Sequence, residues 1–158
     1  MTGGGQQVVT FRLGPDRFAA DVAAVERVLR YQAPTTLPNL PGWMDGVIDY
    51  HRRVVPVVDM RSRFGLPRRE ALPESRIILF VVAEELIGMI VDAVLEVVAV
   101  PAGEISEVPK MFRGLKAEYL RGLIRREEGL TIFLDVPHLL SSGERIELKA
   151  AASGAKDD

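Results

Sequence analysis

Residues 46–59 read GVIDYHRRVVPVVD, and this stretch decides how the chain folds. A glycine opens a short apolar segment, charged residues interrupt it, and a second apolar segment rich in valine ends at Asp59. Short β-branched runs on either side of a polar turn are typical of two strands in a hairpin. Aspartate is a good N-cap residue, so we expect a turn of helix over Met60 to Phe64, ended by Gly65.

The same pattern occurs a second time in the chain. Residues 122–135 read GLIRREEGLTIFLD, which matches residues 46–59 at a displacement of 76 positions without a gap. A displacement of 69 positions superimposes apolar residues of two earlier segments, namely Phe11 on Phe80, Phe18 on Ile87, Val25 on Val94 and Val28 on Val97. The sequence therefore predicts two copies of one unit of about 70 residues.

Most apolar positions follow strand periodicity, and helices are expected to be few and short. A closed sheet would remove the exposed edges of so short a β unit, and a unit of this size is only marginally stable alone. We therefore expect an all-β fold with two β-barrel subdomains, approximately residues 7–72 and 73–142, within a single domain over 7–142. Their shared apolar interface is expected to involve Val22–Leu29 and Val91–Val98.

The two ends of the chain are expected to contribute little to this domain. Residues 1–6 are polar and rich in glycine, so a flexible amino terminus is expected. Residues 143–158 are expected to form a tail, with a short helix over Glu144 to Ala151 and disorder from Ser153 onward.

The composition excludes several functional classes. The chain has 158 residues, a net charge of −2 and no cysteine. The absence of cysteine excludes disulfides and cysteine-ligated zinc and suits a reducing cytoplasm. The charge gives no broad attraction to nucleic acid or to an acidic membrane. No secretion signal or membrane-spanning run is found, so we expect a cytoplasmic protein that a partner recruits to a membrane.

The titratable residues give only weak enzymatic candidates. Asp59 and Asp135 occupy equivalent positions, so a pseudo-two-fold axis could bring them together as a proton-sharing pair. The small hydroxyl and glycine residues that such a loop needs do not follow either aspartate, whereas an N-cap role explains both. His51 and His138 lack a carboxylate at ligand spacing. We expect no catalytic, cofactor or metal site.

A cluster of arginines offers the main alternative function, a small β-barrel that binds nucleic acid or a small ligand. The cluster comprises Arg61, Arg63, Arg68 and Arg69. Single-strand sites interleave cations with stacking aromatics, yet only Phe64 and Tyr50 lie nearby. Glu70 and Glu74 follow at once, so a solvated charged linker is the favoured interpretation.

Four motifs in the chain resemble the CheW-like family. Residues 46–61 are similar to its Gly-Val-Ile-Asn-Leu-Arg-Gly signature, followed by an apolar strand with proline and then Asp-Leu-Arg. The other three motifs lie at residues 11–28, 87–94 and 119–122. Each motif is weak alone, but the four occur in the family's order across about residues 7–142. One departure is local: the family's Asn-Leu-Arg-Gly is Asp49-Tyr50-His51-Arg52 here, without its forked guanidinium and its glycine.

The resemblance implies two SH3-like five-stranded barrels and a non-catalytic adaptor in chemotaxis or a related chemosensory pathway. It implies binding to chemoreceptor cytoplasmic tips through an apolar groove between the barrels, and barrel-against-barrel binding to the regulatory domain of a CheA-type histidine kinase. The family matches at the groove are Val25, Gly46, His51 and Val54. Their structural alternatives stay open: core residues for the two valines, a backbone requirement for Gly46 and a solvated turn for His51.

Overall fold

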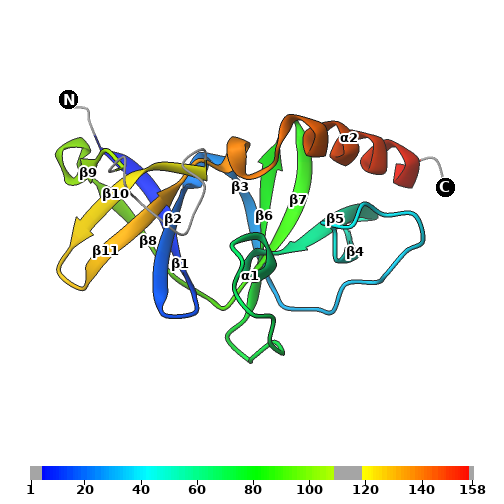
Figure 1. The fold of residues 1–158 in the computed structure, drawn as a ribbon, viewed down its shortest axis with the longest axis horizontal. Coiled ribbons are helices and arrows are strands. Elements are labelled where there is room, and N and C mark those ends of the chain that lie inside the picture. Colours follow the sequence, from blue (N-terminus) through cyan, green and yellow to red (C-terminus); the bar gives the residue numbers. More distant parts are fainter. Residues whose placement is uncertain (1–4, 109–118, 157–158) are drawn as a thin grey trace.

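The computed structural model describes residues 5–108 and 119–156, and it consists of two sheets that lie side by side (Figure 1). The six-stranded sheet has the order β8(Ala93–Val100), β1(Gln6–Leu13), β2(Asp16–Asp21), β11(Gly129–Leu134), β10(Leu120–Arg126) and β9(Ile105–Ser106). The five-stranded sheet has the order β3(Val25–Arg30), β6(Arg76–Val82), β7(Glu85–Val91), β5(Arg53–Asp59) and β4(Gly46–Tyr50).

The helices are few, which confirms the expected mostly β class. The α-helices are α1(Met60–Arg63) and α2(Ser142–Lys156), and the described 3-10 turns are η1(Val22–Ala24), η2(Ala102–Glu104) and η4(Val136–Leu139). In Figure 1, α1 lies between the two sheets and α2 extends over the end formed by β5 and β7. No helix within the described residues has the length and apolar character needed to cross a membrane.

The two sheets do not follow the division of the chain expected at residues 72 and 73. The hairpin β1–β2 pairs with β8 and β11 of the second repeat, and the hairpin β6–β7 pairs with β3 and β5 of the first. The two repeats have therefore exchanged their first hairpins. The exchange is symmetric: the parallel pair Phe133 and Ala19 has the same register as the pair Val57 and Gly88.

The exchange places a shared apolar cluster between the sheets. Alternate residues of β1 and β6 enter it, namely Val9, Phe11, Leu13, Ile78, Phe80 and Val82. The intervening residues of these strands point to the opposite face of their sheet, where each sheet has an apolar cluster of its own. Examples are Val8 in the six-stranded sheet and Ile77 and Leu79 in the five-stranded sheet. Phe11 and Phe80 are both fully buried in the shared cluster, as their superposition in the repeat suggests.

The expected interface segments contribute to this cluster only in part. Val91 belongs to the shared cluster, and Val22, Val25 and Val94 pack against it. Leu29 and Val98 instead line the clusters inside the five-stranded and the six-stranded sheet. Half of the buried residues in this cluster come from the exchanged hairpins β1–β2 and β6–β7.

The carboxyl-terminal helix is longer than expected, since it runs through Lys156. Ser141 and Glu144 form a reciprocal cap at its start: the Ser141 N–H donates to Glu144 Oε1 at 2.8 Å, and the Glu144 N–H donates to Ser141 Oγ at 3.1 Å. This Ser-x-x-Glu spacing is a readable capping box. At the amino terminus, strand β1 already begins at Gln6, which pairs with Val100 of β8. Residues 1–4 lie outside the described residues.

The exchange predicts that neither half of the chain folds alone. Fragments 1–72 and 73–158 should each be unfolded, because each lacks the strands that complete its sheet and half of the shared cluster. Mixing the two fragments should restore a native nuclear magnetic resonance spectrum. Well-dispersed spectra from the separate fragments would contradict the exchange.

Candidate functional site: the joint between the two sheets

The short helix α1 and the residue after it form a joint between the sheets. Met60 is fully buried in the shared cluster. Phe64 stacks on Phe18 of the six-stranded sheet, with ring centroids 5.3 Å apart, and also contacts the ring of Tyr119 at 5.8 Å. Asp59 caps the helix by accepting a hydrogen bond from the Arg61 N–H at 3.0 Å, which confirms its expected role. The cap fixes where the α1 side chains point.

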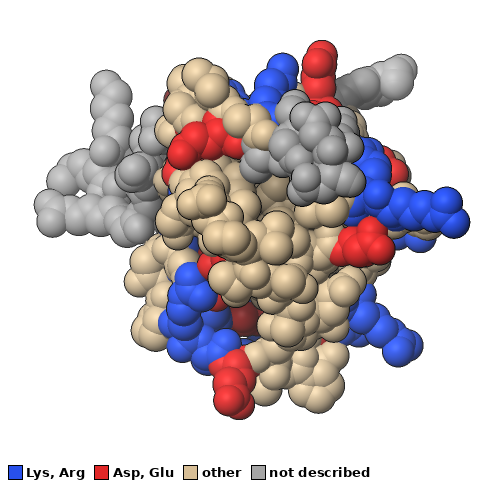
Figure 2. All heavy atoms as spheres, turned by 90° about the vertical axis from the view of Figure 1, so that its right-hand side faces the viewer, with Lys and Arg blue, Asp and Glu red and all other residues tan. Residues whose placement is uncertain are grey.

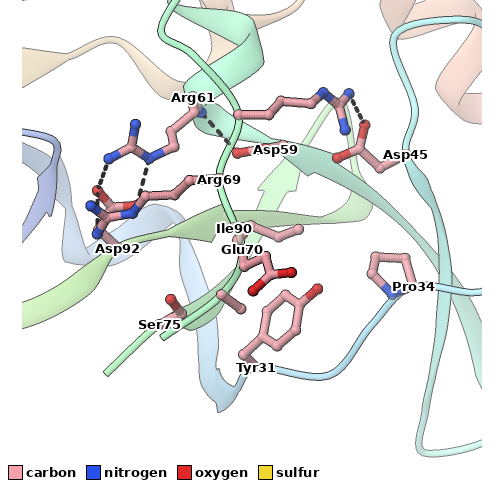
Figure 3. A pocket seen from close by; sticks show the side chains of 12 residues that line it. Tyr31, Pro34, Asp45, Asp59, Arg61, Arg69, Glu70, Ser75, Ile90 and Asp92 are labelled. Atoms are coloured by element: carbon pink, nitrogen blue, oxygen red, sulfur yellow. Dashed lines mark hydrogen bonds and ion pairs between the residues drawn. The ribbon is translucent and has the colours of Figure 1, made fainter. Parts of the chain in front are cut away.

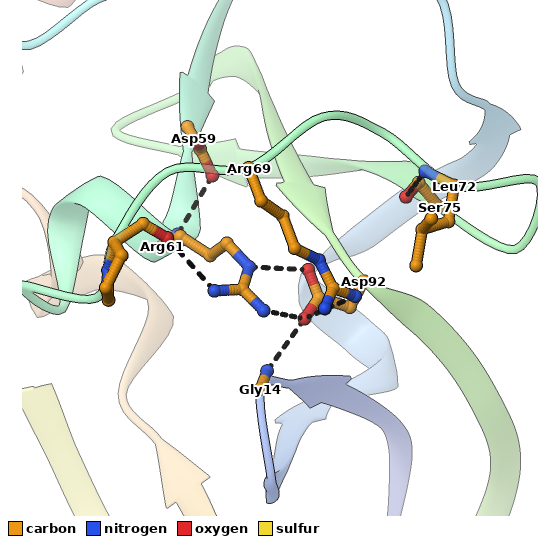
Figure 4. A network of polar contacts seen from close by, with 8 residues as sticks. Gly14, Asp59, Arg61, Arg69, Leu72, Ser75 and Asp92 are labelled. Carbon is orange, nitrogen blue, oxygen red and sulfur yellow. Dashed lines mark hydrogen bonds and ion pairs between the residues drawn. The ribbon is translucent and has the colours of Figure 1, made fainter.

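A buried ion pair joins three segments at this joint (Figure 4). The guanidinium of Arg61 donates Nε–H to Asp92 Oδ1 at 2.9 Å and Nη2–H to Asp92 Oδ2 at 2.7 Å. The Gly14 N–H donates to Asp92 Oδ2 at 2.7 Å. Arg61 follows β5 of the five-stranded sheet, Asp92 lies where the chain passes from β7 to β8, and Gly14 lies in the β1–β2 turn of the six-stranded sheet. We call this group the inter-sheet bridge.

The environment of the bridge keeps both groups charged. Arg61 and Asp92 are only 9% and 6% exposed. Burial alone would raise the pKa of Asp92, but the hydrogen bonds from Arg61 and Gly14 and the positive charges of Arg61 and Arg69 lower it overall. The hydrogen bond to Asp92 raises the pKa of Arg61 above its usual range. The carboxylate therefore remains ionised at neutral pH.

A second polar contact of α1 holds the helix α2 in place. Arg63 donates Nε–H to the Leu139 carbonyl at 3.0 Å and makes a forked pair with Glu144, with Nη1 to Oε2 at 2.8 Å. The pair lowers the pKa of Glu144 against the opposing effect of burial. Farther along α2, Glu147 accepts a hydrogen bond from Trp43 Nε1 at 3.0 Å, and Leu148 is fully buried.

These contacts correct the expectation that the arginine cluster is a solvated linker. Arg61 is buried and Arg63 is mostly so, because each side chain crosses to another part of the fold. Arg68 and Arg69 are the exposed members: Arg68 pairs with Asp45 at 2.8 Å, and Arg69 lies 3.6 Å from Asp92. No local sequence signal reveals the Arg61 partner, which lies 31 positions along the chain.

A polar hollow of about 250 Å³ adjoins the bridge (Figure 3). Its charged lining residues carry both signs and are Asp45, Asp59, Arg61, Arg68, Arg69, Glu70 and Asp92. Burial raises the pKa of Asp59 despite its hydrogen bond from the Arg61 N–H. No group of three or more histidine, aspartate or glutamate side chains with metal-binding geometry occurs among the described residues.

The two equivalent aspartates have different partners. Asp59 caps α1, whereas the Asp135 side chain makes no capping hydrogen bond and pairs instead with His138 Nδ1 at 2.9 Å. The expectation of an N-cap is therefore confirmed at Asp59, whereas Asp135 occupies the N-cap position of η4 without a capping hydrogen bond from its side chain. Pro137 occupies the position at which Arg61 supplies the capped N–H in the first repeat, so the second copy has no such donor.

Comparison with known proteins places this architecture in a family. The sequence model of the CheW-like domain matches residues 7–144. The chain belongs to the CheW-like domain family. It is 29% identical over 144 residues to the chemotaxis protein CheW of Treponema pallidum, covering 87% of this chain and 84% of the relative. The CheW of Bacillus subtilis is 28% identical over 136 residues, with 86% and 87% covered.

A solved structure of a CheW protein has the same fold. The scaffolding protein CheW of Thermoanaerobacter tengcongensis superimposes with a TM-score of 0.77 at 26% identity. The match covers 85% of this chain and 91% of that protein. The fold with two exchanged sheets is thus shared with a CheW scaffolding protein.

The four groove residues implied by the CheW-like resemblance are spread over the five-stranded sheet. His51 and Val54 lie at the tip of the β4–β5 hairpin, and Gly46 lies at its opposite end. Val25 opens β3, which β6 and β7 separate from β5 in the sheet order, and its side chain packs against the shared cluster. The hairpin tip brings only His51 and Val54 together.

The CheW-like hairpin turn adopts a left-handed backbone without its usual glycine. His51 and Arg52 have φ values of 49° and 66°. Two consecutive residues in this region are typical of a type I′ turn, for which asparagine and glycine are preferred. The His51 ring lies edge-on to Tyr50, with centroids 4.3 Å apart. Val54 is 37% exposed, so its side chain is available at the surface.

Gly46 serves a backbone requirement that recurs at Gly122. A Cβ atom at Gly46 would lie 2.6 Å from the Thr35 carbonyl oxygen, and one at Gly122 would lie 2.6 Å from the Ser106 carbonyl oxygen. At both positions a neighbouring segment pairs closely with the strand, through Thr35 with Val47 and through Ser106 with Leu123. The glycine is therefore part of the repeated fold.

Alanine at either glycine should destabilise the protein. Gly46→Ala and Gly122→Ala should each lower the free energy of unfolding by about 1–3 kcal/mol, because the backbone must shift to admit the Cβ. Gly42→Ala and Gly103→Ala are matched controls, since nothing lies within 4 Å of a Cβ there. Urea unfolding measures all four; equal stability of the two pairs would count against the close approach.

The inter-sheet bridge should control the acid sensitivity of the fold. A carboxylate with a lowered pKa contributes stability that is complete above its unfolded pKa of about 4 and is lost as the pH falls through the folded value. Asp92→Asn should cost about 3–5 kcal/mol at pH 7, because it leaves a buried guanidinium without its counter-ion. It should also flatten the loss of stability between about pH 5 and 2.

The control is Glu128→Gln, which removes an exposed ion pair with Arg126 inside one hairpin. This change should alter stability by no more than about 0.5 kcal/mol. Urea unfolding over a pH series is the measurement. An Asp92→Asn variant with the wild-type pH slope would show that the bridge is not the acid-sensitive contact.

Proposed function

We propose that this chain is a non-catalytic adaptor that couples chemoreceptors to a CheA-type histidine kinase. The observation that carries the proposal is the CheW-like match over residues 7–144, together with a shared fold in a protein described as a scaffold. The chain would act in the cytoplasm and reach receptor arrays at the membrane through its partners. Its partners would be the cytoplasmic tips of chemoreceptors and the regulatory domain of the kinase.

The chemistry of the described residues supports an adaptor better than a nucleic-acid barrel. A single-strand site needs free cations beside stacking aromatics. Arg61 and Arg63 are instead engaged by Asp92 and Glu144 inside the fold. Arg68 is paired as well, with Asp45. Three of the four arginines that suggested the alternative function are therefore paired with carboxylates of the fold.

The surface at one end of the molecule also suits a protein partner. Residues 31–44 follow β3 and contain no charged residue, and Leu37 among them is 40% exposed. Figure 2 shows the end of the molecule at the right of Figure 1, where uncharged side chains cover most of the middle and charged ones lie mainly toward the margins. A face with few charges suits a protein partner better than a polyanion such as nucleic acid.

The receptor contacts are proposed at Val25, Gly46, His51 and Val54. His51 and Val54 offer exposed side chains for a direct contact, whereas Gly46 and Val25 would act mainly through backbone shape and packing. Capture from lysate is the first test: recovery of receptors and a kinase supports the adaptor, and recovery of RNA alone would overturn it.

Substitution of His51 should separate binding from folding. His51→Asp keeps a residue that tolerates the left-handed turn, so stability should change by no more than about 0.5 kcal/mol. A carboxylate facing an acidic receptor surface should weaken binding by about 1–3 kcal/mol. Calorimetric titration with a receptor cytoplasmic fragment measures the affinity, and a thermal melt measures the fold.

Glu127→Gln is the matched control, because Glu127 occupies the equivalent turn of the second repeat and is exposed. It should leave receptor affinity unchanged. Wild-type affinity of His51→Asp would remove His51 from the receptor contact, and unfolding of that variant would show that the turn is structural.

A further inference from the structure

Each sheet of this fold is built from both halves of the chain. The amino-terminal half, residues 5–69, contributes β1 to β5, and the carboxyl-terminal half, residues 75–156, contributes β6 to β11. β1 pairs with β8 and β2 with β11 in the six-stranded sheet, whereas β3 pairs with β6 and β5 with β7 in the five-stranded sheet. Each of the three apolar clusters also contains residues from both halves. Neither half therefore has a complete sheet or a complete core of its own.

Residues 70–74 connect the two halves and form few contacts with either of them. They lie in the green loop beneath α1 in Figure 1, contain no strand or helix, and are all exposed. The hydrogen bonds that the structure shows for them are local. Leu72 and Ser75 bond to each other through two contacts of 2.9 Å, and the Pro73 carbonyl accepts a hydrogen bond from Arg76. We call residues 70–74 the hinge, because this segment can extend without breaking a strand pair.

We propose that two copies of this chain exchange halves across the hinge and form a closed dimer. The amino-terminal half of each copy completes its sheets with the carboxyl-terminal half of the other copy. Both resulting folds keep the strand pairs and the apolar clusters of the monomer, and only the hinge changes its path. Exchange of identical elements is a low-cost route to a symmetric dimer. Such a dimer carries the exposed hairpin tip with His51 and Val54 twice.

The incomplete halves make the exchange depend on protein concentration. A folding chain must obtain the complementary half either from itself or from a neighbouring chain. A short flexible connection presents the chain's own half at an effective concentration of about 1 mM. After refolding at about 1 mM, the ratio of dimer to monomer should therefore be near one, and it should be about a hundredfold lower at about 10 μM. Interconversion requires both sheets to open, so the two species should be separable after dilution.

Engineered cysteine pairs can identify which chain supplies each strand, because the protein has no cysteine of its own. Residues directly opposite each other on antiparallel strands lie at a distance that a disulfide can bridge. Gln7→Cys with Ala99→Cys places one pair across β1 and β8 of the six-stranded sheet. Arg30→Cys with Arg76→Cys places a second pair across β3 and β6 of the five-stranded sheet. Both pairs join the two halves.

The matched control is Arg12→Cys with Arg17→Cys, since these residues are opposite each other on β1 and β2 of the same half. Each full-length variant is unfolded in urea and refolded at both concentrations. Monomer and dimer are then separated by size-exclusion chromatography, oxidised after dilution and run on a denaturing gel without reductant.

In the dimer fraction, both cross-half pairs should link two chains, so the protein should run at twice the mass of one chain. The monomer fraction, and the control pair in either fraction, should run as single chains. Absence of a dimer after refolding at about 1 mM, or a dimer whose cross-half pairs run as single chains, would overturn the exchange. If the pair at Gln7 and Ala99 alone links two chains, only the β1–β2 hairpin is exchanged, and the role of the hinge is wrong.

Discussion

Parallel pairing between the repeats is the constraint on which the rest of the structure depends. β2 runs beside β11 and β7 runs beside β5, so each sheet is complete only when the other repeat supplies a hairpin. The outward faces of the exchanged hairpins then have to meet, and Phe11 and Phe80 are buried there. One cooperative body results from two units that are each too small to bury an adequate core.

The exchange also determines which polar side chains of α1 can form contacts between distant parts of the chain. It brings the end of β5 against the β1–β2 turn, and the helix α1 fills that place with Met60 and Phe64. Arg61 and Arg63 then reach in different directions, to Asp92 between the sheets and to Glu144 at the start of α2. The tip of the β4–β5 hairpin lies away from this joint, and His51 and Val54 are exposed there.

Local features of the sequence were sufficient to predict the hairpins, the repeat and the cap at Asp59. The exchange could not be predicted in this way, because both repeats carry the same apolar alternation and β6 fits β3 as well as β8. The inter-sheet bridge was missed for a related reason: Arg61 lies among other arginines, and Asp92 follows an apolar strand with no sign of a partner. Only the tertiary arrangement brings these two charges together.

As an adaptor, this one small body would have to hold a receptor and a kinase at the same time. Sedimentation velocity of a receptor cytoplasmic fragment and a kinase regulatory domain, with and without this protein, tests that claim most directly. The account predicts a ternary species that contains all three proteins and forms only when this protein is present. If saturating amounts of one partner displace the other, the protein binds them at one surface, and the adaptor account is wrong.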